Sequence, residues 1–248
     1  MDAILQCVWK KMRLQMRKIN QVTSVDQATK LADAGVDVLG CCLAAAHEPR
    51  RGRIDEGQLR AIVDSIERRT ALSFDADSGY TAVQMRRVLD DHGIDFLEVL
   101  PVDPEKKTAH EQELQWLREV PQPKIASGYF LMKDDLSYLK HVDYFKRLMD
   151  AGVAYFQFEI DSLIDPKFKI GRADAARVER FFEEIPCLVC DRWTALDAYP
   201  SQHARGRYMN ITAAALEPGQ NYDYSQLAFP FSQVLALLQG RRIARSGP

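Results

Sequence analysis

Short apolar runs alternate along the chain with segments in which apolar residues recur every three or four positions. The first pattern is typical of buried β-strands and the second of amphipathic helices. The apolar runs predict eight strands, over Met16–Val22, Val36–Leu43, Ala71–Asp77, Ile94–Leu100, Lys124–Phe130, Ala154–Asp161, Pro186–Asp191 and Arg207–Thr212. Because strands and helices alternate, we expect one parallel sheet with helices packed on it.

Helix-start signals support this alternation. Ser24 with Gln27, and Thr81 with Gln84, have the spacing of a capping box, in which a hydroxyl and a Gln side chain satisfy free N–H groups at the helix start. Gly35 then ends the first helical segment, as glycine does at many helix ends. An apolar stripe predicts one continuous later helix through Leu136, Leu139, Val142, Phe145 and Met149, with His141 inside it.

The length of the chain favours a single large domain. It has 248 residues, of which 46% are apolar. Single (β/α)8 barrels run to roughly 250 residues, and the count of eight strands matches them. An open doubly wound sheet shares the alternation, but no G-x-G-x-x-G motif follows the first strand. We therefore predict an α/β protein with one (β/α)8 TIM barrel over residues 16–240, an extension over residues 1–15 and a basic tail over residues 241–248.

Charge and cysteine content narrow the partners and the cellular setting. The net charge is −2 and no basic stripe is interleaved with aromatic residues, so we expect no nucleic-acid partner. No apolar run reaches the ~20 residues that span a bilayer, so we expect no membrane association. The five cysteines are odd in number and no export signal precedes them, which predicts reduced thiols in the cytoplasm. The expected partner is a small-molecule substrate, and a homodimer is left open.

Residues 17–43 carry the most informative motif. They read R-K-I-N-Q-V-T-S-V-D-Q-A-T-K-L-A-D-A-G-V-D-V-L-G-C-C-L, a strand, a capped helix and a second strand. This segment resembles the start of phosphoribosylanthranilate isomerase, a (β/α)8 barrel of the tryptophan pathway, which reads K-I-C-G-I-T where this chain reads K-I-N-Q-V-T. The resemblance extends from Lys18 to about Leu100. It implies that Pro49 and Arg50 match a loop whose arginine contacts substrate, and that Asp161 aligns with the general acid of the family.

The chain departs from that family at both of its functional hallmarks. The general base of the family is a cysteine, and the residue here is Asn20, whose amide cannot take up a proton near neutral pH. The family binds phosphate with glycine-rich turns, whereas this chain has Asp191-Arg-Trp-Thr-Ala-Leu-Asp and Ile211-Thr-Ala-Ala-Ala-Leu-Glu. Larger residues keep a phosphate away from backbone N–H groups. We infer a divergent barrel with different chemistry.

Residue parity separates side chains that face the barrel interior from those that pack on helices. In the sixth strand, Tyr155, Gln157 and Glu159 share one parity and Phe156 and Phe158 the other, so we expect the first set to point inward. The same sorting gathers six carboxylates at the carboxyl-end opening of the barrel, here called the mouth. They are Asp75, Asp77, Glu98, Glu159, Asp161 and Asp191.

These carboxylates need compensation, because like charges in a partly buried site repel one another. Lys18, Lys124 or Arg192 can pair with some of them, raised pKa values can keep others protonated, or a divalent cation can bind among them. A purely structural role as helix N-caps or loop anchors also suits three of the acids, namely Asp75, Asp77 and Asp191.

The first functional hypothesis is an isomerase or lyase of small-molecule metabolism that acts on a polar, anionic metabolite without a required cofactor. The predicted catalytic residues are Glu98, Glu159 and Asp161, which would transfer protons. The predicted substrate-binding residues are Lys18, Asn20, His47, Arg50, Asp75, Asp191 and Asn210.

Two alternative functions stay open. A metal-dependent enzyme, such as a non-haem iron oxygenase, would use His47, Glu98 and Glu159 to bind iron, manganese or magnesium. A non-catalytic binding barrel would suit the absent base and glycines, although an idle site does not need so many inward acids. A desolvated Lys18 or Lys124 can also form a Schiff base with a carbonyl substrate.

Overall fold

Eight parallel strands hydrogen-bond in sequence order, and the last pairs with the first to close a barrel. The computed structural model describes residues 16–75, 78–130, 136–159, 172–190, 203–211 and 228–240. The strands are β1 (Met16–Asn20), β2 (Val38–Leu43), β3 (Arg69–Phe74), β4 (Phe96–Val99), β5 (Lys124–Phe130), β6 (Val153–Glu159), β7 (Cys187–Cys190) and β8 (Gly206–Ile211). A further short strand, β9 (Ala228–Phe229), pairs with β8. The protein is a (β/α)8 TIM barrel, as the alternation predicts.

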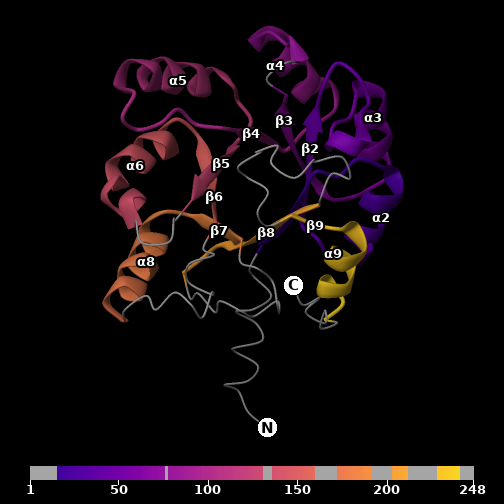
Figure 1. The fold of residues 1–248 in the computed structure, drawn as a ribbon. Helices are drawn as coiled ribbons and strands as arrows, with labels where there is room; N and C mark the ends of the chain where they lie inside the picture. Colours follow the sequence, from indigo (N-terminus) through magenta and orange to yellow (C-terminus); the bar gives the residue numbers. More distant parts are fainter. Residues whose placement is uncertain are drawn as a thin grey trace.

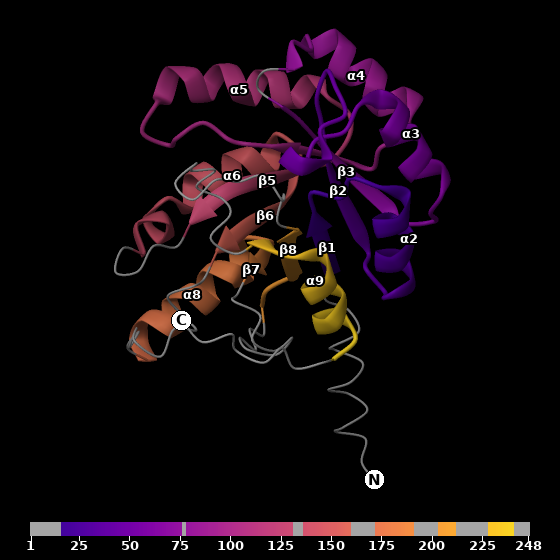
Figure 2. The same ribbon diagram turned by 45° about the vertical axis from the view of Figure 1, so that its right-hand side comes forward.

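Helices cover the outside of the strands, as Figure 1 and the turned view in Figure 2 show. They are α2 (Val25–Asp33), α3 (Glu56–Asp64), α4 (Ala82–Asp91), α5 (Lys107–Glu119), α6 (Val142–Asp150), α8 (Arg172–Glu184) and α9 (Phe231–Leu238), with the 3-10 helices η1 (Pro49–Arg51) and η3 (Leu136–Lys140). Within the described ranges no helix has the length and apolar character needed to cross a membrane. The expected extension (1–15) and tail (241–248) lie outside the described residues.

Capping side chains fix where α2 and α4 begin. The hydroxyl groups of Ser24 and Thr81 accept hydrogen bonds from backbone N–H groups of the first helical turn. Thr81 and Gln84 form the predicted capping box. In the other predicted box, the Gln27 side chain accepts from the backbone N–H of Thr23, one residue before the cap, so only half of that prediction is confirmed. Such caps typically contribute about 1 kcal/mol each.

Two apolar regions stabilise the barrel on opposite faces of its strands. Phe156 and Phe158 of β6 point outward and pack against Phe145 of α6 and Phe181 of α8, with ring centroids 5.2–5.7 Å apart. The interior is filled at the amino end of the strands by Met16, Val38, Ala71, Phe96, Ile125, Leu188 and Tyr208, with Tyr155 packed against them. The predicted inward and outward sorting of β6 is confirmed for these residues. Layered filling of this kind is typical of the fold.

The predicted single helix from Leu136 to Met149 is wrong. The stripe covers two elements, the 3-10 helix η3 and then α6, and His141 is the N-cap between them. The backbone N–H of His141 donates to Tyr138 three residues earlier, which closes a 3-10 turn. Apolar spacing alone cannot distinguish this break from a continuous helix.

Lys124 cannot neutralise the acids at the mouth, which corrects that expectation. It is the first residue of β5, so it lies at the amino end of the barrel, and the next residue, Ile125, takes the interior position. The Lys124 ammonium donates to the carbonyl of Val120 at 2.5 Å. Burial lowers the pKa of Lys124. The same position at the far end removes it as a Schiff-base candidate for the mouth.

Candidate active site

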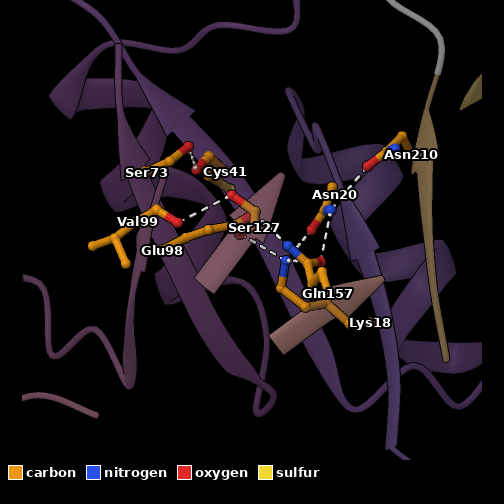
Figure 3. Close-up of polar contacts among 9 residues, drawn as sticks. All are labelled: Lys18, Asn20, Cys41, Ser73, Glu98, Val99, Ser127, Gln157 and Asn210. Atoms are coloured by element: carbon orange, nitrogen blue, oxygen red, sulfur yellow. Dashed lines mark hydrogen bonds and ion pairs between the residues drawn. The ribbon is translucent and has the colours of Figure 1, made fainter. Parts of the chain in front are cut away.

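A polar layer fills the barrel interior between the apolar residues and the mouth. In several strands a polar side chain lies two positions after an apolar interior residue, as Lys18 follows Met16 and Glu98 follows Phe96. The layer comprises Lys18 and Asn20 of β1, Ser73 of β3, Glu98 of β4, Ser127 of β5, Gln157 of β6 and Asn210 of β8 (Figure 3). Active sites of this fold lie at the carboxyl ends of the strands, so this layer is the candidate site.

Lys18 lies at the centre of the layer and is fully buried. Its Nζ atom is 2.7 Å from Glu98 Oε2 and 3.2 Å from Gln157 Oε1, and it also donates to Asn20 Oδ1. Burial lowers the pKa of Lys18, while the charge of Glu98 acts in the opposite direction. Three acceptors around one nitrogen match the three protons of an ammonium group. A Schiff base would need a neutral amine that a carbonyl can reach, and this arrangement does not suit it.

Three carboxamides extend the network across the barrel. Asn20 Nδ2 donates to Gln157 Oε1 at 3.1 Å and to Asn210 Oδ1 at 2.8 Å. Gln157 Nε2 donates to Glu98 Oε1 at 2.8 Å. Because Lys18 can only donate, the amide oxygens of Asn20 and Gln157 must face it, which fixes the orientation of both amides. The network therefore joins β1, β4, β6 and β8 through side chains alone.

A glycine makes room for this crossing. Gly40 of β2 occupies an interior position beside β1. A Cβ atom at that position would lie 2.6 Å from Asn20 Oδ1 and 3.2 Å from Lys18 Nζ. The first distance is shorter than any normal contact, so a larger residue would displace Asn20.

The backbone is strained directly after Asn20. Gln21 has φ 64°, in the left-handed region that residues other than glycine rarely adopt. The family that this segment resembles has glycine at that position. The Gln21 side chain lies beside Gly52, with three carbons 3.5–3.6 Å from where a Cβ on Gly52 would be. This packing connects the end of β1 to the loop after β2.

A second ion pair lies at the mouth, above the polar layer. Arg53 donates to Asp75 at 2.8 Å, and both side chains are 13% exposed. In the same loop Arg51 pairs with Glu48 at 3.3 Å, with both side chains more exposed. The side chain of Arg50, predicted to bind an anionic group, lies outside the described part of the chain.

The structure brings four of the predicted site residues together and a fifth close to the mouth. Lys18, Asn20, Glu98 and Asn210 share one hydrogen-bond network, and Asp75 pairs with Arg53. His47 is exposed in the loop after β2 and joins none of these interactions. The remaining predicted acids cannot be placed, because Asp77, Asp161, Asp191 and the side chain of Glu159 lie outside the described residues.

Three members of the layer, Ser73, Ser127 and Gln157, carry no role in the sequence-based hypothesis. Gln157 is predicted to point inward but not to bind, although a polar residue between Phe156 and Phe158 is a signal for an interior site. Ser127 gives no such signal, because a register shift between Ala126 and Tyr129 interrupts the alternation of β5. The cross-barrel partners of Gln157 depend on strand closure, which local sequence does not encode.

Comparison with known proteins agrees with this architecture. No protein-family model matches the chain, and no curated protein does. Solved structures match at low identity. A monomeric form of the dimeric phosphoribosylanthranilate isomerase of Thermotoga maritima is 9% identical, with 91% of this chain and 98% of that chain covered and a TM-score of 0.55. The isomerase of Thermus thermophilus is 12% identical, with 91% and 97% covered and a TM-score of 0.55.

The chain shares the barrel fold of these isomerases. A putative phosphonomutase from Burkholderia cenocepacia has a similar barrel at 13% identity, with 78% of this chain and 86% of that chain covered and a TM-score of 0.54. Enzymes with different names therefore match about equally well. At such identities the likeness shows the fold alone, because one barrel supports many chemistries.

A divalent cation finds little support among the described side chains. They contain no group of three or more His, Cys, Asp or Glu residues able to hold a metal ion. Glu98, the described carboxylate of the predicted metal triad, already pairs with the Lys18 ammonium. A cation bound to that carboxylate would be repelled by Lys18 across a short distance. The metal hypothesis therefore depends on Glu159, whose side chain lies outside the described part.

Proposed function

We propose that this protein is an enzyme of small-molecule metabolism in which Glu98 transfers a proton, in an isomerase or lyase reaction. The observation that supports this proposal most is how the Glu98 carboxylate is held and how far it is exposed. Lys18 and Gln157 each hold one of its oxygens, yet its side chain keeps 11% exposure. A general base must be held in place and still reach its substrate, and Glu98 meets both requirements.

The neighbouring residues have distinct roles in this proposal. Lys18 acts through Glu98, because its three protons are all bound by protein groups and it has no exposed surface. It is a positioning residue that holds one oxygen of the Glu98 carboxylate. Asn20 and Asn210, which are linked to Glu98 through Gln157, would contact the polar groups of the substrate. Asp161, which the resemblance aligns with a general acid, would supply the second proton-transfer group.

The test is a proton-exchange assay. The protein is incubated in D2O with pools of small polar metabolites, and NMR follows exchange at carbon and the appearance of isomers. Glu98→Gln should lower the rate by at least about 100-fold, the usual contribution of a general base. Glu67→Gln, on an exposed residue, is the matched control and should behave like the wild type.

Loss of activity through unfolding must be separated from loss of the base. The double variant Lys18→Met/Glu98→Gln removes both charges of the buried pair, so it should fold and remain inactive. Circular dichroism and thermal melts check folding. Wild-type turnover in a folded Glu98→Gln protein would overturn the assignment.

A binding protein without turnover is the second candidate. The observation that favours it is the completeness of the network, in which Lys18 and the Asn20 amide N–H groups are all satisfied by protein partners. Such closed networks also serve as rigid structural cores. A ligand that binds at the mouth without proton exchange or conversion would favour this candidate.

A further inference from the structure

Strands β3, β4 and β5 form one wall of the mouth. The described interior side chains of this wall offer hydrogen-bond acceptors to a ligand and no free donors. Ser73 Oγ donates to the carbonyl of Cys41 at 3.2 Å, and Ser127 Oγ donates to the carbonyl of Val99 at 3.2 Å (Figure 3). A hydroxyl has one proton, and a backbone carbonyl can only accept. Both serine oxygens therefore keep only lone pairs for another molecule.

Glu98 lies between these serines and adds further acceptors. It belongs to β4, the strand between β3 and β5, and register extension from the pair Leu72–Leu97 places it level with Ser73. An ionised carboxylate has about four lone-pair sites and no proton. Lys18 and Gln157 use one site on each oxygen, so acceptor capacity remains.

The described carboxylates on this side of the mouth, Glu98 and Asp75, are each paired with a cation. Lys18 neutralises Glu98 at 2.7 Å, and Arg53 neutralises Asp75 at 2.8 Å. A cationic donor placed against Glu98 would meet the Lys18 charge nearby, and an anion would meet two carboxylates. Uncharged donors avoid both penalties, and hydroxyl groups are the commonest uncharged donors in polar metabolites.

We propose that the ligand of this site is an uncharged polyhydroxyl compound, a sugar or a polyol, whose hydroxyl groups donate to Ser73, Glu98 and Ser127. This inference rests on the proposed function for the identity of the site and adds the substrate class. It replaces the anionic substrate expected from the sequence, because the described arginines of the loop after β2 already pair with acids.

The test is a matched ligand series on the whole protein. Ribitol, xylitol, D-mannitol and D-glucitol are compared with their phosphate esters and their amino-deoxy analogues, with affinities from saturation-transfer NMR. At least one uncharged polyol should bind, and its charged analogues should bind at least tenfold more weakly. A phosphate ester or amine that binds more tightly than its parent polyol overturns the proposal, and so does the failure of every polyol to bind.

Cys42 reports whether binding occurs at this site. It is a partly buried residue of β2, paired in register with Ser73. Burial raises the pKa of Cys42, so alkylation is measured at mildly alkaline pH by peptide mass spectrometry. A polyol bound at the mouth should slow alkylation of Cys42. Binding without any protection of Cys42 places the ligand elsewhere and overturns the proposal.

Serine variants test the individual contacts. Ser73→Ala and Ser127→Ala should each weaken polyol binding by about threefold to tenfold, the loss expected for one neutral hydrogen bond. Ser65→Ala is the matched control, because Ser65 also donates its hydroxyl to a carbonyl, that of Ile62, but at the end of α3. Equal affinities in all three variants would contradict the proposed contacts.

The outcomes separate this inference from the proposed function. Turnover that depends on Glu98 but uses a substrate without hydroxyl groups would retain the function and overturn the polyol. Polyol binding that depends on Ser73 and Ser127, with no proton exchange in the wild type, would retain the polyol and overturn the enzyme.

Discussion

The Lys18 side chain has no exposed surface, and its ammonium group forms an ion pair with Glu98. The stability of the folded protein therefore depends on both partners. Removing one partner of a buried ion pair commonly costs about 3–5 kcal/mol, because the other charge is left uncompensated. Lys18→Met should therefore lower the free energy of unfolding by about that amount. Lys18→Met/Glu98→Gln should lose less than the sum of the two single variants. Urea unfolding of all four proteins measures this coupling, and strict additivity would mean that the pair does not interact.

The lowered pKa of Lys18 predicts how stability responds to pH. The pKa of Lys18 in the unfolded chain is near the ordinary lysine value of 10.5, and burial places the pKa in the folded protein below it. As pH rises through that interval, the folded protein releases the proton first, so the unfolded state binds more protons and stability increases with pH. Relative to the double variant, which has neither charge, the wild type should become more stable as pH rises from 7 toward 10.5. A flat difference across that range would contradict the lowered pKa.

Single residues of the site can be identified from the sequence, but their partners cannot. Strand parity alone directs Lys18, Asn20, Glu98 and Asn210 inward, and the structure has them there. Apart from the bond between Lys18 and Asn20, the bonds among these residues join positions 80 and 190 residues apart. Only closure of the barrel brings such residues together, so their pairing follows from the tertiary fold and not from any local pattern.

In the loop after β2, Gly52 lies beside one strained residue, Gln21. Gln21 keeps a left-handed backbone, at a cost of about 1–2 kcal/mol, while its side chain packs beside Gly52. Gln21→Gly should relieve the strain and also remove that packing. We expect faster amide hydrogen exchange over residues 48–53, with global stability changed by no more than about 1–2 kcal/mol.

Gln21→Asn is the control for this loop, because asparagine tolerates the left-handed region and keeps part of the side chain. Its exchange over residues 48–53 should lie between those of the wild type and Gln21→Gly. Mass spectrometry of the peptide that contains Arg53 measures both. If the glycine variant exchanged no faster than the wild type, Gln21 would have no role in holding the loop.

At the scale of elements, the sequence predicts the regular alternation of strands and helices. It does not predict the segments in which a turn or a bulge interrupts a regular element. All eight strands are where apolar runs predict them, within a few residues, because burial on both faces leaves a strong signal. The η3–α6 segment and the irregular β5 are less predictable. In each, a local turn or bulge changes the direction of side chains without changing the apolar composition.

The interior of the whole barrel has two parts. One stabilises the fold, and the other is available for chemistry. Apolar side chains fill the amino-end half, and the polar layer occupies the carboxyl-end half. This division is predictable, because active sites of this fold lie at the carboxyl ends of the strands. The reaction is not predictable from it, since isomerases and a putative phosphonomutase share the architecture at similar TM-scores.

Similarity of the whole fold therefore does not predict anthranilate chemistry, and genetic complementation tests this directly. A bacterial tryptophan auxotroph without phosphoribosylanthranilate isomerase should not grow on medium without tryptophan when it expresses this protein. Asn20 takes the place of the cysteine base that the resemblance implies, and both of its amide N–H groups are bound by Gln157 and Asn210. The Thermotoga maritima isomerase is the positive control, and immunoblotting confirms soluble expression of both proteins. Growth without tryptophan would show that a different residue acts as base, and Glu98→Gln in the same strain would then identify whether that base is Glu98.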